Sequence, residues 1–189
     1  MVYNNVLYIK QALDGILMQI LNGSYEIVIG DDFSDDGTFE IIKQYELKYP
    51  HLIKVLERNI GDEYYQRRVK GNHLINFIDI LNNCKGKYIA LLDGDDYWID
   101  PYKLQKQVDL LENNKRYSIV AHDVGLLYDG VEEVYPFQTI FDKQEFGFID
   151  EFNHHFISTK CSFRRSELYG LPPAFENNLL EIYHWNYSY

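Results

Sequence analysis

The segment Tyr88-Ile89-Ala90-Leu91-Leu92 is apolar without interruption, and charged residues and glycines bound it on both sides. A strand with one face in water alternates apolar and polar side chains, whereas a strand covered on both faces is apolar along its length. Tyr25–Ile29 and Leu52–Leu56 are predicted to be further strands of this buried type. Such strands are typical of a parallel sheet with helices on both faces, so an α/β fold is expected.

Between these strands, apolar residues recur at steps of three and four positions, the spacing of one helix face. The first of four predicted helices is capped by Asn4 or Asn5 and ended by Asn22-Gly23, and the last begins at Asp100-Pro101. The four apolar faces comprise Val6, Ile9, Leu13, Ile16, Leu17 and Ile20; Phe39, Ile42, Tyr45 and Tyr49; Leu74, Phe77, Ile78 and Leu81; and Leu104, Val108 and Leu111.

The other segments are less regular. The polar stretch Asn59–His73 is expected to be a long functional or mobile loop. Further strands are predicted over Ser118–His122 and Cys161–Arg164, and a hairpin is predicted to join Leu126–Tyr128 to Val134-Tyr135.

Acidic residues follow two of the buried strands, as Asp31-Asp32 and as Asp93-Gly94-Asp95-Asp96. Ligands of open α/β sheets bind beyond the carboxyl ends of the strands, where both clusters are expected to lie. Carboxylates packed this closely repel one another unless a cation is present, and Mg²⁺ or Mn²⁺ needs only one or two of them beside substrate phosphates. The second cluster is therefore predicted to bind a divalent cation, with a solvated acidic turn as the alternative.

The first cluster does not encode a calcium loop, because an EF-hand that starts at Asp32 would place Lys43 where a bidentate Glu is required. An Asp at a strand end that accepts hydrogen bonds from a base or ribose fits better. Asp35 and Asp36 are predicted to be turn and helix-cap residues.

The composition of the chain and the absence of several known motifs disfavour a number of functional classes. The chain has 29 acidic and 18 basic residues, a formal net charge of −11, which argues against binding nucleic acid. No apolar run reaches the roughly 18 residues of a membrane span and no signal peptide opens the chain, so a cytoplasmic location is expected. Cys84 and Cys161 form no zinc or disulfide pattern, and His154-His155 has no HExxH partner. The P-loop, GxGxxG and GxSxG motifs are absent.

Two other classes also place acids at strand ends. A phosphotransfer receiver domain needs a lysine at a later strand end, and no clear candidate follows Ser118–Asp123. A DxDx[TV] phosphatase is disfavoured because Tyr97 stands at the hydroxyl or valine position.

The chain enters the first predicted helix almost directly after Met1-Val2, with no strand before it. Such a strand is normally central in an open α/β sheet. Losing about four buried aliphatic side chains would remove roughly 6–12 kcal/mol, against a whole-domain stability of about 5–15 kcal/mol. The chain is therefore expected to be a fragment of a longer product.

Three motifs occur in order and at compatible spacing: Tyr3-Asn4-Asn5 followed by Tyr8-Ile9, then Glu26–Thr38, then Gly86–Trp98. Over about residues 3–123 the chain thereby resembles the family-2 glycosyltransferases. The resemblance implies the GT-A fold, a Rossmann-like and mostly parallel sheet flanked by helices. It also implies one incomplete domain, with a nucleotide-sugar-binding part over residues 1–125 and a partial acceptor-side part over residues 126–189.

Carried over to this sequence, the resemblance assigns roles to four residues. Tyr3 would pack against the nucleobase, Asp32 would bind the base, Asp93 would reach the ribose or diphosphate, and Asp95 would ligate the divalent metal, Mn²⁺ or Mg²⁺. The metal would stabilise the charge that develops on the departing phosphate.

A carboxylate or similar base would take the proton of the acceptor hydroxyl while its oxygen attacks the anomeric carbon. The candidates are Glu181 and His184, and a base beyond this chain is equally compatible. The resemblance implies inverting transfer, with a UDP-sugar as the expected donor and a glycan or lipid-linked acceptor of a surface polysaccharide. Peripheral association with the inner face of the membrane is compatible with such an acceptor. The competing hypothesis is a truncated or degenerate glycosyltransferase that binds nucleotide without turnover.

Overall fold

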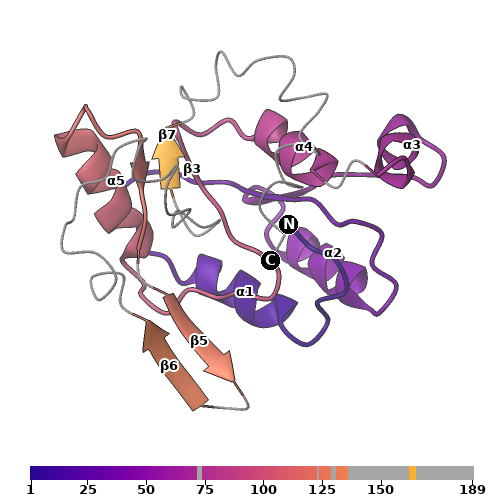
Figure 1. Ribbon diagram of the computed structural model, residues 1–189, viewed down its shortest axis with the longest axis horizontal. Coiled ribbons are helices and arrows are strands. Elements are labelled where there is room, and N and C mark those ends of the chain that lie inside the picture. The colour runs from indigo at the N-terminus through magenta and orange to yellow at the C-terminus, as the bar shows by residue number, and fades with distance from the viewer. Residues whose placement is uncertain (72–73, 123, 129–130, 136–161, 165–189) are drawn as a thin grey trace, which may run out of the picture.

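The computed structural model describes residues 1–71, 74–122, 124–128, 131–135 and 162–164. The helices in this part are α1 (Ile9–Leu17), α2 (Thr38–Lys48), α3 (Glu63–Val69), α4 (Ile75–Asn83) and α5 (Lys103–Asn113). The strands are β1 (Ile27–Ile29), β2 (Ile53–Val55), β3 (Tyr88–Ala90), β4 (Ile119–Val120), β5 (Val124–Tyr128), β6 (Val131–Tyr135) and β7 (Ser162–Arg164). Apart from the consecutive helices α3 and α4, helices and strands alternate as far as β4, which confirms the predicted α/β class (Figure 1).

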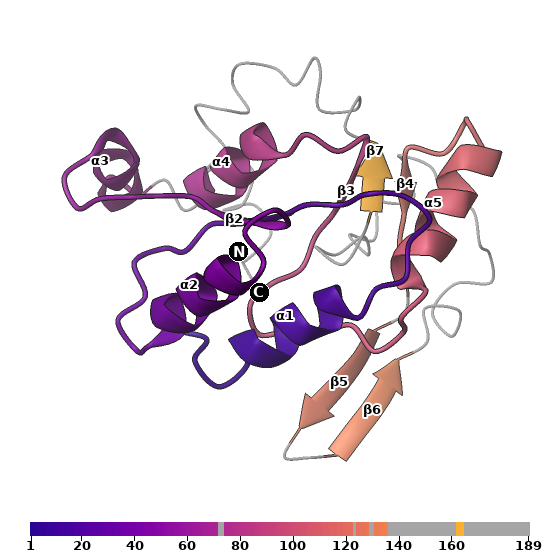
Figure 2. The ribbon, with the colours of Figure 1, turned by 180° about the vertical axis from the view of Figure 1, so that it is seen from behind.

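The strands form three groups. β1 and β2 are parallel, with Ile27 opposite Ile53. β7 lies between β3 and β4 and is antiparallel to both, so β3 and β4 run in the same direction. β5 and β6 form the predicted hairpin, which extends away from the other elements in both views (Figures 1 and 2).

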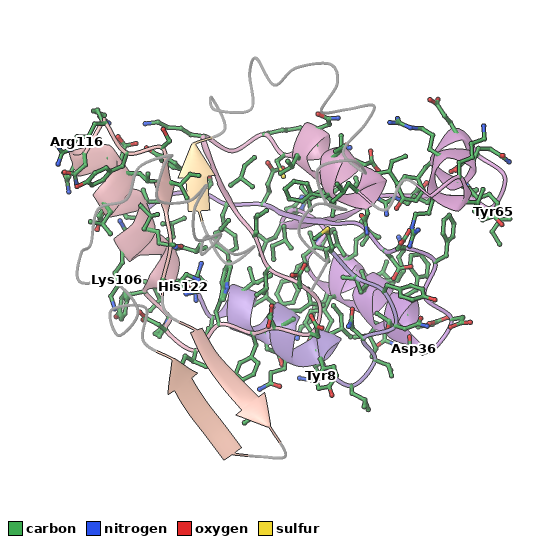
Figure 3. All side chains as sticks on the ribbon, in the orientation of Figure 1. Tyr8, Asp36, Tyr65, Lys106, Arg116 and His122 are labelled. Atoms are coloured by element: carbon green, nitrogen blue, oxygen red, sulfur yellow. The ribbon has the colours of Figure 1, made fainter. Side chains whose placement is uncertain are left out.

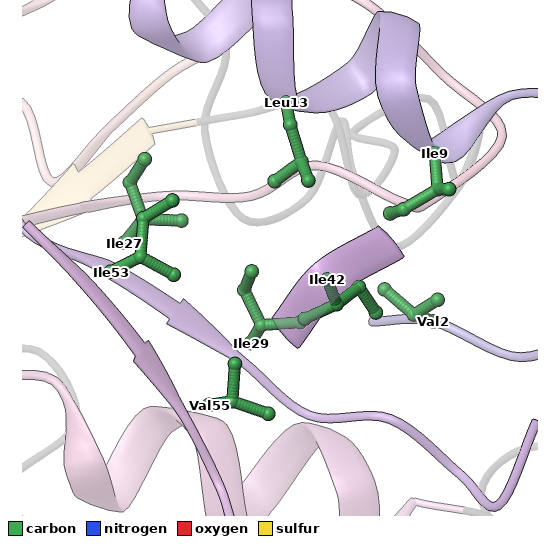
Figure 4. Close-up of a cluster of buried hydrophobic side chains, with 8 residues drawn as sticks. All are labelled: Val2, Ile9, Leu13, Ile27, Ile29, Ile42, Ile53 and Val55. Atoms are coloured by element: carbon green, nitrogen blue, oxygen red, sulfur yellow. The ribbon is translucent and has the colours of Figure 1, made fainter. Parts of the chain in front are cut away.

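Helices cover both faces of the β1–β2 pair. α1 and α2 lie on one side of these strands and α4 lies on the other (Figures 1 and 4). The buried cluster between them combines side chains from the two helices and both strands, and its members are Val2, Ile9, Leu13, Ile27, Ile29, Ile42, Ile53 and Val55 (Figure 4). Of the two predicted helix faces, Ile9, Leu13 and Ile42 are buried in this cluster, whereas Ile20 and Phe39 are exposed, contrary to the prediction.

The first helix is shorter than predicted. α1 begins at Ile9 rather than after an asparagine cap, because both asparagines bond elsewhere. Asn5 Oδ1 accepts the Tyr3 N–H at 3.0 Å, and Asn4 Nδ2 donates to Asp35 Oδ1 at 3.1 Å. These side chains fix the segment before the helix against the loop after β1, which delays the first helical turn.

The prediction of an unstructured loop over Asn59–His73 is wrong for its middle part, which forms helix α3. Asp62 caps this helix, since its side chain accepts the Tyr65 N–H at 2.7 Å. α3 buries none of its residues, so it has no apolar face for a periodicity argument to detect.

The carboxyl ends of β1 and β3 are joined by Met1-Val2 rather than by direct pairing. Val2 forms an isolated parallel bridge with Asp31. Behind this bridge lies a cavity of about 330 Å³, lined largely by apolar side chains that include Ile27, Ile89 and Leu111. That the chain is a fragment of a longer product stays a prediction.

The described helices include none that is both long and apolar enough to cross a membrane.

Candidate nucleotide-sugar site

The two acidic clusters flank the same short extended segment. On one side, Val2 donates to the Gly30 carbonyl at 3.1 Å and accepts from the Asp32 N–H at 2.9 Å. On the other side, the Met1 ammonium donates to the Leu92 carbonyl at 3.2 Å, and the Gly94 N–H donates to the Met1 carbonyl at 2.9 Å. Since paired strands lie about 5 Å apart, the backbones of the two acidic loops are about 10 Å apart. The structure thus brings both clusters to one edge, as predicted.

Asp31 builds the first loop and is buried in it. Its carboxylate accepts the Ser34 N–H at 2.9 Å and the Ser34 hydroxyl at 2.5 Å. The turn forces Phe33 to a φ of 64°, a left-handed conformation that non-glycine residues rarely adopt. Asp31 therefore shapes the loop, and its own carboxylate is taken up by these hydrogen bonds.

Asp36 forms a turn directly before α2 rather than the predicted cap, because the N-cap residue of the helix is Gly37. Asp36 accepts from the Thr38 N–H at 3.0 Å at the start of α2 and from the Val6 N–H at 3.1 Å, so it ties the loop to the segment before α1. These backbone and hydroxyl hydrogen bonds oppose the cost of burial and hold the pKa of the Asp36 carboxyl below its ordinary value. Asp36 lies beside α2 in Figure 3. Tyr3, whose N–H donates to Asn5 Oδ1, is 58% exposed and accessible to a ligand.

Asp32 is held by helix α3. Tyr64 donates its hydroxyl to Asp32 Oδ1 at 2.9 Å, and Arg68 donates its Nε–H to Asp32 Oδ2 at 2.6 Å. The Asp32 side chain is only 9% exposed. Burial raises the pKa of the Tyr64 hydroxyl, and its hydrogen bond to Asp32 raises it further, so Tyr64 stays a proton donor. Neither contact was predicted from the sequence, because both partners lie more than 30 positions from Asp32 on a helix that was not predicted.

Arg58, at the carboxyl end of β2, is a second group that sequence analysis missed. Its side chain is 4% exposed, and it donates to the Asp31 carbonyl and to Asp79 Oδ2, both at 2.9 Å. Its guanidinium lies 3.8 Å from the centre of the Tyr64 ring. Arg58 therefore braces the first acidic loop and α3 together. The only sequence signal was a cation directly after a predicted strand.

The second acidic loop turns tightly. The Asp96 N–H donates to the Asp93 carbonyl at 3.2 Å. A side chain at Gly94 would meet Asn5 Oδ1 at 2.7 Å, so the close approach of the two segments requires glycine. Asp95 is exposed and Asp93 is half-buried. Burial lowers the pKa of the Met1 ammonium, whereas Asp93 and Asp95 both raise it, which places both carboxylates within electrostatic reach of the segment between the clusters.

Packing behind this loop fixes its position. Trp98 is buried, with Lys103 Nζ 3.9 Å from the centre of its ring. α1 approaches so closely that a Cβ on Gly15 would lie 2.9 Å from both the backbone N and O of Trp98. The α5 helix that follows begins at Lys103, two residues later than predicted, because Asp100 Oδ1 first accepts the Tyr102 N–H in a separate turn.

The donor set at the second loop fits Mg²⁺ or Mn²⁺, whose ligands are hard oxygens. In the part of the chain that the structure describes, no group of three His, Cys, Asp or Glu side chains could hold a metal by itself. One or two carboxylates that share the ion with substrate phosphates do not need such a group. Glu181 and His184, the predicted candidates for the base, lie outside the described residues.

Comparisons with known proteins agree with this arrangement. The model of the family described as "Glycosyl transferase family 2" matches residues 1–170. The uncharacterized protein Rv1520 of Mycobacterium tuberculosis is 39% identical over 134 residues, which are 69% of this chain and 36% of that protein.

Two solved structures share the fold. S. aureus TarS 1-349 in complex with UDP has a TM-score of 0.61 at 22% identity, over 88% of this chain and 46% of that chain. The mannosyltransferase PcManGT from Pyrobaculum calidifontis in complex with GDP-Man and Mn²⁺ has a TM-score of 0.54 at 17% identity, over 90% of this chain and 45% of that chain. The chain spans less than half the length of each of these proteins. The likeness confirms the predicted GT-A fold.

Proposed function

Because the chain belongs to glycosyl transferase family 2, we propose that it transfers a sugar, with inversion, from a nucleoside-diphosphate sugar to a glycan or lipid-linked acceptor. The observation that carries the proposal is the shared edge. A carboxylate suited to a base, Asp32, and an exposed carboxylate suited to a cation, Asp95, lie on either side of Met1-Val2. The separation of about two strand spacings is compatible with a nucleoside at one loop and its diphosphate at the other.

Each residue has a defined task in this proposal. Asp32, as an ionised carboxylate, accepts hydrogen bonds from the N–H groups of a base, and the exposed Tyr3 ring packs against the face of the base. Asp93 binds the ribose or diphosphate. Asp95 would hold the divalent cation, which supplies charge stabilisation for the departing diphosphate. Glu181 or His184 takes the proton of the acceptor hydroxyl.

Two neighbours guide the choice of probes. TarS 1-349 was solved with UDP, and PcManGT was solved with GDP-Man and Mn²⁺. UDP with and without Mn²⁺ is therefore the first pair to test, and GDP is the second. Nucleic acid is not proposed as a partner, because a net charge of −11 repels its phosphates.

The test is the Mn²⁺ dependence of UDP affinity, measured by calorimetry on the wild type and on Asp95→Asn. Since a bridging cation contributes several kcal/mol, we expect Mn²⁺ to tighten UDP binding at least tenfold in the wild type and to have little effect in Asp95→Asn. Asp109→Asn is the matched control, because Asp109 is exposed on α5 and undergoes the same charge change.

An unchanged Mn²⁺ effect in Asp95→Asn would refute the assignment of the cation to the second loop. Sugar transfer from UDP-sugars, followed by release of UDP, then separates the transferase from the competing hypothesis. Tight, Mn²⁺-dependent UDP binding with no transfer to any acceptor would favour a domain that binds nucleotide without turnover.

A further inference from the structure

Helix α3 occupies the carboxylate that the proposed function assigns to the base. Both oxygens of Asp32 accept hydrogen bonds from α3, one from the Tyr64 hydroxyl and one from Arg68 Nε. An ionised carboxylate has about four acceptor positions, so two remain in principle. The 9% exposure of the Asp32 side chain leaves no room for the edge of a base to reach them. A nucleoside that binds Asp32 must therefore displace α3.

The attachment of α3 is compatible with such a movement. The helix buries none of its residues, and it lies at the periphery of the molecule in both views, with Tyr65 near the outer end in Figure 3 (Figures 1–3). A cavity of about 240 Å³ separates it from α4, lined by residues that include Tyr64, Arg67 and Ile78. Because little apolar surface holds the helix down, its local opening costs little compared with global unfolding.

Glycines with left-handed backbones flank the helix. Gly61 has a φ of 96° and Gly71 a φ of 92°, and an added Cβ would meet no atom within 4 Å at either position. Glycine at both ends is compatible with a change of backbone angles there, since it has no side chain to restrict them. The contacts that hold the helix closed are therefore concentrated on the side that faces the first acidic loop, where Phe33 packs edge-on against Tyr65 with ring centres 5.4 Å apart.

We propose that α3 is a lid that Tyr64 and Arg68 close over Asp32 in the free protein, and that a nucleoside opens it by taking over the Asp32 carboxylate. The inference rests on the proposed function, because it takes Asp32 as the base-binding group. Closure keeps the carboxylate paired until a ligand arrives. It also lowers the apparent nucleoside affinity in proportion to the fraction of molecules that are open.

The experiment compares uridine affinity, by calorimetry, in the wild type, Tyr64→Phe and Arg68→Gln. Uridine is the probe because it has no phosphate. Its affinity therefore does not depend on any contact between Arg68 and a phosphate. We expect uridine to bind about threefold tighter to Tyr64→Phe and about tenfold tighter to Arg68→Gln, since each variant loses one contact of the closed state and the second contact is the charged one. Arg67→Gln is the control, because Arg67 is an exposed neighbour on the same helix and its affinity should stay at the wild-type value.

Tyr64→Phe keeps the ring that stacks on Arg58, so this variant tests the lid even if Arg68→Gln does not fold. Hydrogen exchange of the Glu63–Val69 amides gives an independent measurement. Saturating uridine should speed exchange in α3 of the wild type, and unchanged or slower exchange would overturn the lid.

The outcomes separate the two proposals. If the wild type binds uridine and UDP but neither variant binds uridine more tightly, the lid is wrong and the proposed function stands. If neither the wild type nor any variant binds uridine, UDP or GDP with or without Mn²⁺, both proposals fail.

Discussion

Replacing Arg58 by Met should destabilise the fold, although it keeps most of the volume of the side chain. The guanidinium is 4% exposed and makes two charge-assisted hydrogen bonds, each of which contributes about 1.5–3 kcal/mol. The bond to Asp79 is discounted, because that side chain is 36% exposed and rehydrates in the variant. Water cannot replace the lost bond to the Asp31 carbonyl, because Asp31 is only 6% exposed. An unpaired buried carbonyl costs about 1–3 kcal/mol.

Two further contributions nearly cancel. The loss of the stack on Tyr64 removes about 1 kcal/mol. The Arg58 Nε–H has no acceptor among the described residues, so its removal returns a similar amount. The expected loss for Arg58→Met is therefore about 2–3 kcal/mol in the free energy of unfolding. For a chain of this size that corresponds to a fall in Tm of about 5–10 °C.

Urea unfolding followed by tryptophan fluorescence measures this loss, because Trp98 is buried in the folded protein. Lys54→Met is the control on the same strand, since the Lys54 side chain is exposed and donates to Asn83 Oδ1 at the surface. The control should change stability by no more than about 0.5 kcal/mol. If Arg58→Met is as stable as this control, Arg58 does not brace the acidic loop and the argument from its burial is wrong.

Two more variants test the site's support and its surface charge. Gly15→Ala should weaken Mn²⁺-dependent UDP binding, because the new Cβ would lie 2.9 Å from the Trp98 backbone and push the second acidic loop away. An affinity equal to that of the wild type would show that the position of the loop does not depend on this contact. Lys115 and Lys87 lower the pKa of the exposed Glu112 carboxyl from 4.5 to about 2, so its contribution to stability is complete above pH 4.5 and is lost as the pH falls toward 2. Glu112→Gln should therefore show a smaller fall in Tm over this interval than the wild type, and equal falls would contradict the role of Glu112.

Much of the fold was predictable from local pattern. The unbroken apolar run at Tyr88–Leu92 predicted β3, and the three- and four-residue spacing predicted α2 and α4. Asp36 was recognisable as a residue of the turn before α2, since the Thr38 N–H that it accepts lies two positions away. The placement of both acidic clusters at one edge followed from the rule that parallel strands end on the same side.

Other features of the site had no local signal. α3 was missed because a helix that buries nothing carries no periodicity, and its cap at Asp62 is a short-range signal that also fits a turn. The ends of α1 were misplaced because Asn4 bonds to Asp35, a partner 31 positions away. Helix ends depend on such partners as much as on the residues that could cap them.

The sequence alone determined most of the buried strand and helix side chains, and where the carboxylates lie along the strands, because hydrophobic burial and backbone period act within one element; Ile20 and Phe39 are the exposed exceptions. Only the tertiary structure decided what each carboxylate contacts. It set β7 between β3 and β4, it placed Arg58 beneath the Asp31 loop, and it closed α3 over Asp32. Those contacts join residues that are remote in the chain, and their distances depend on how the elements pack, which no local pattern encodes.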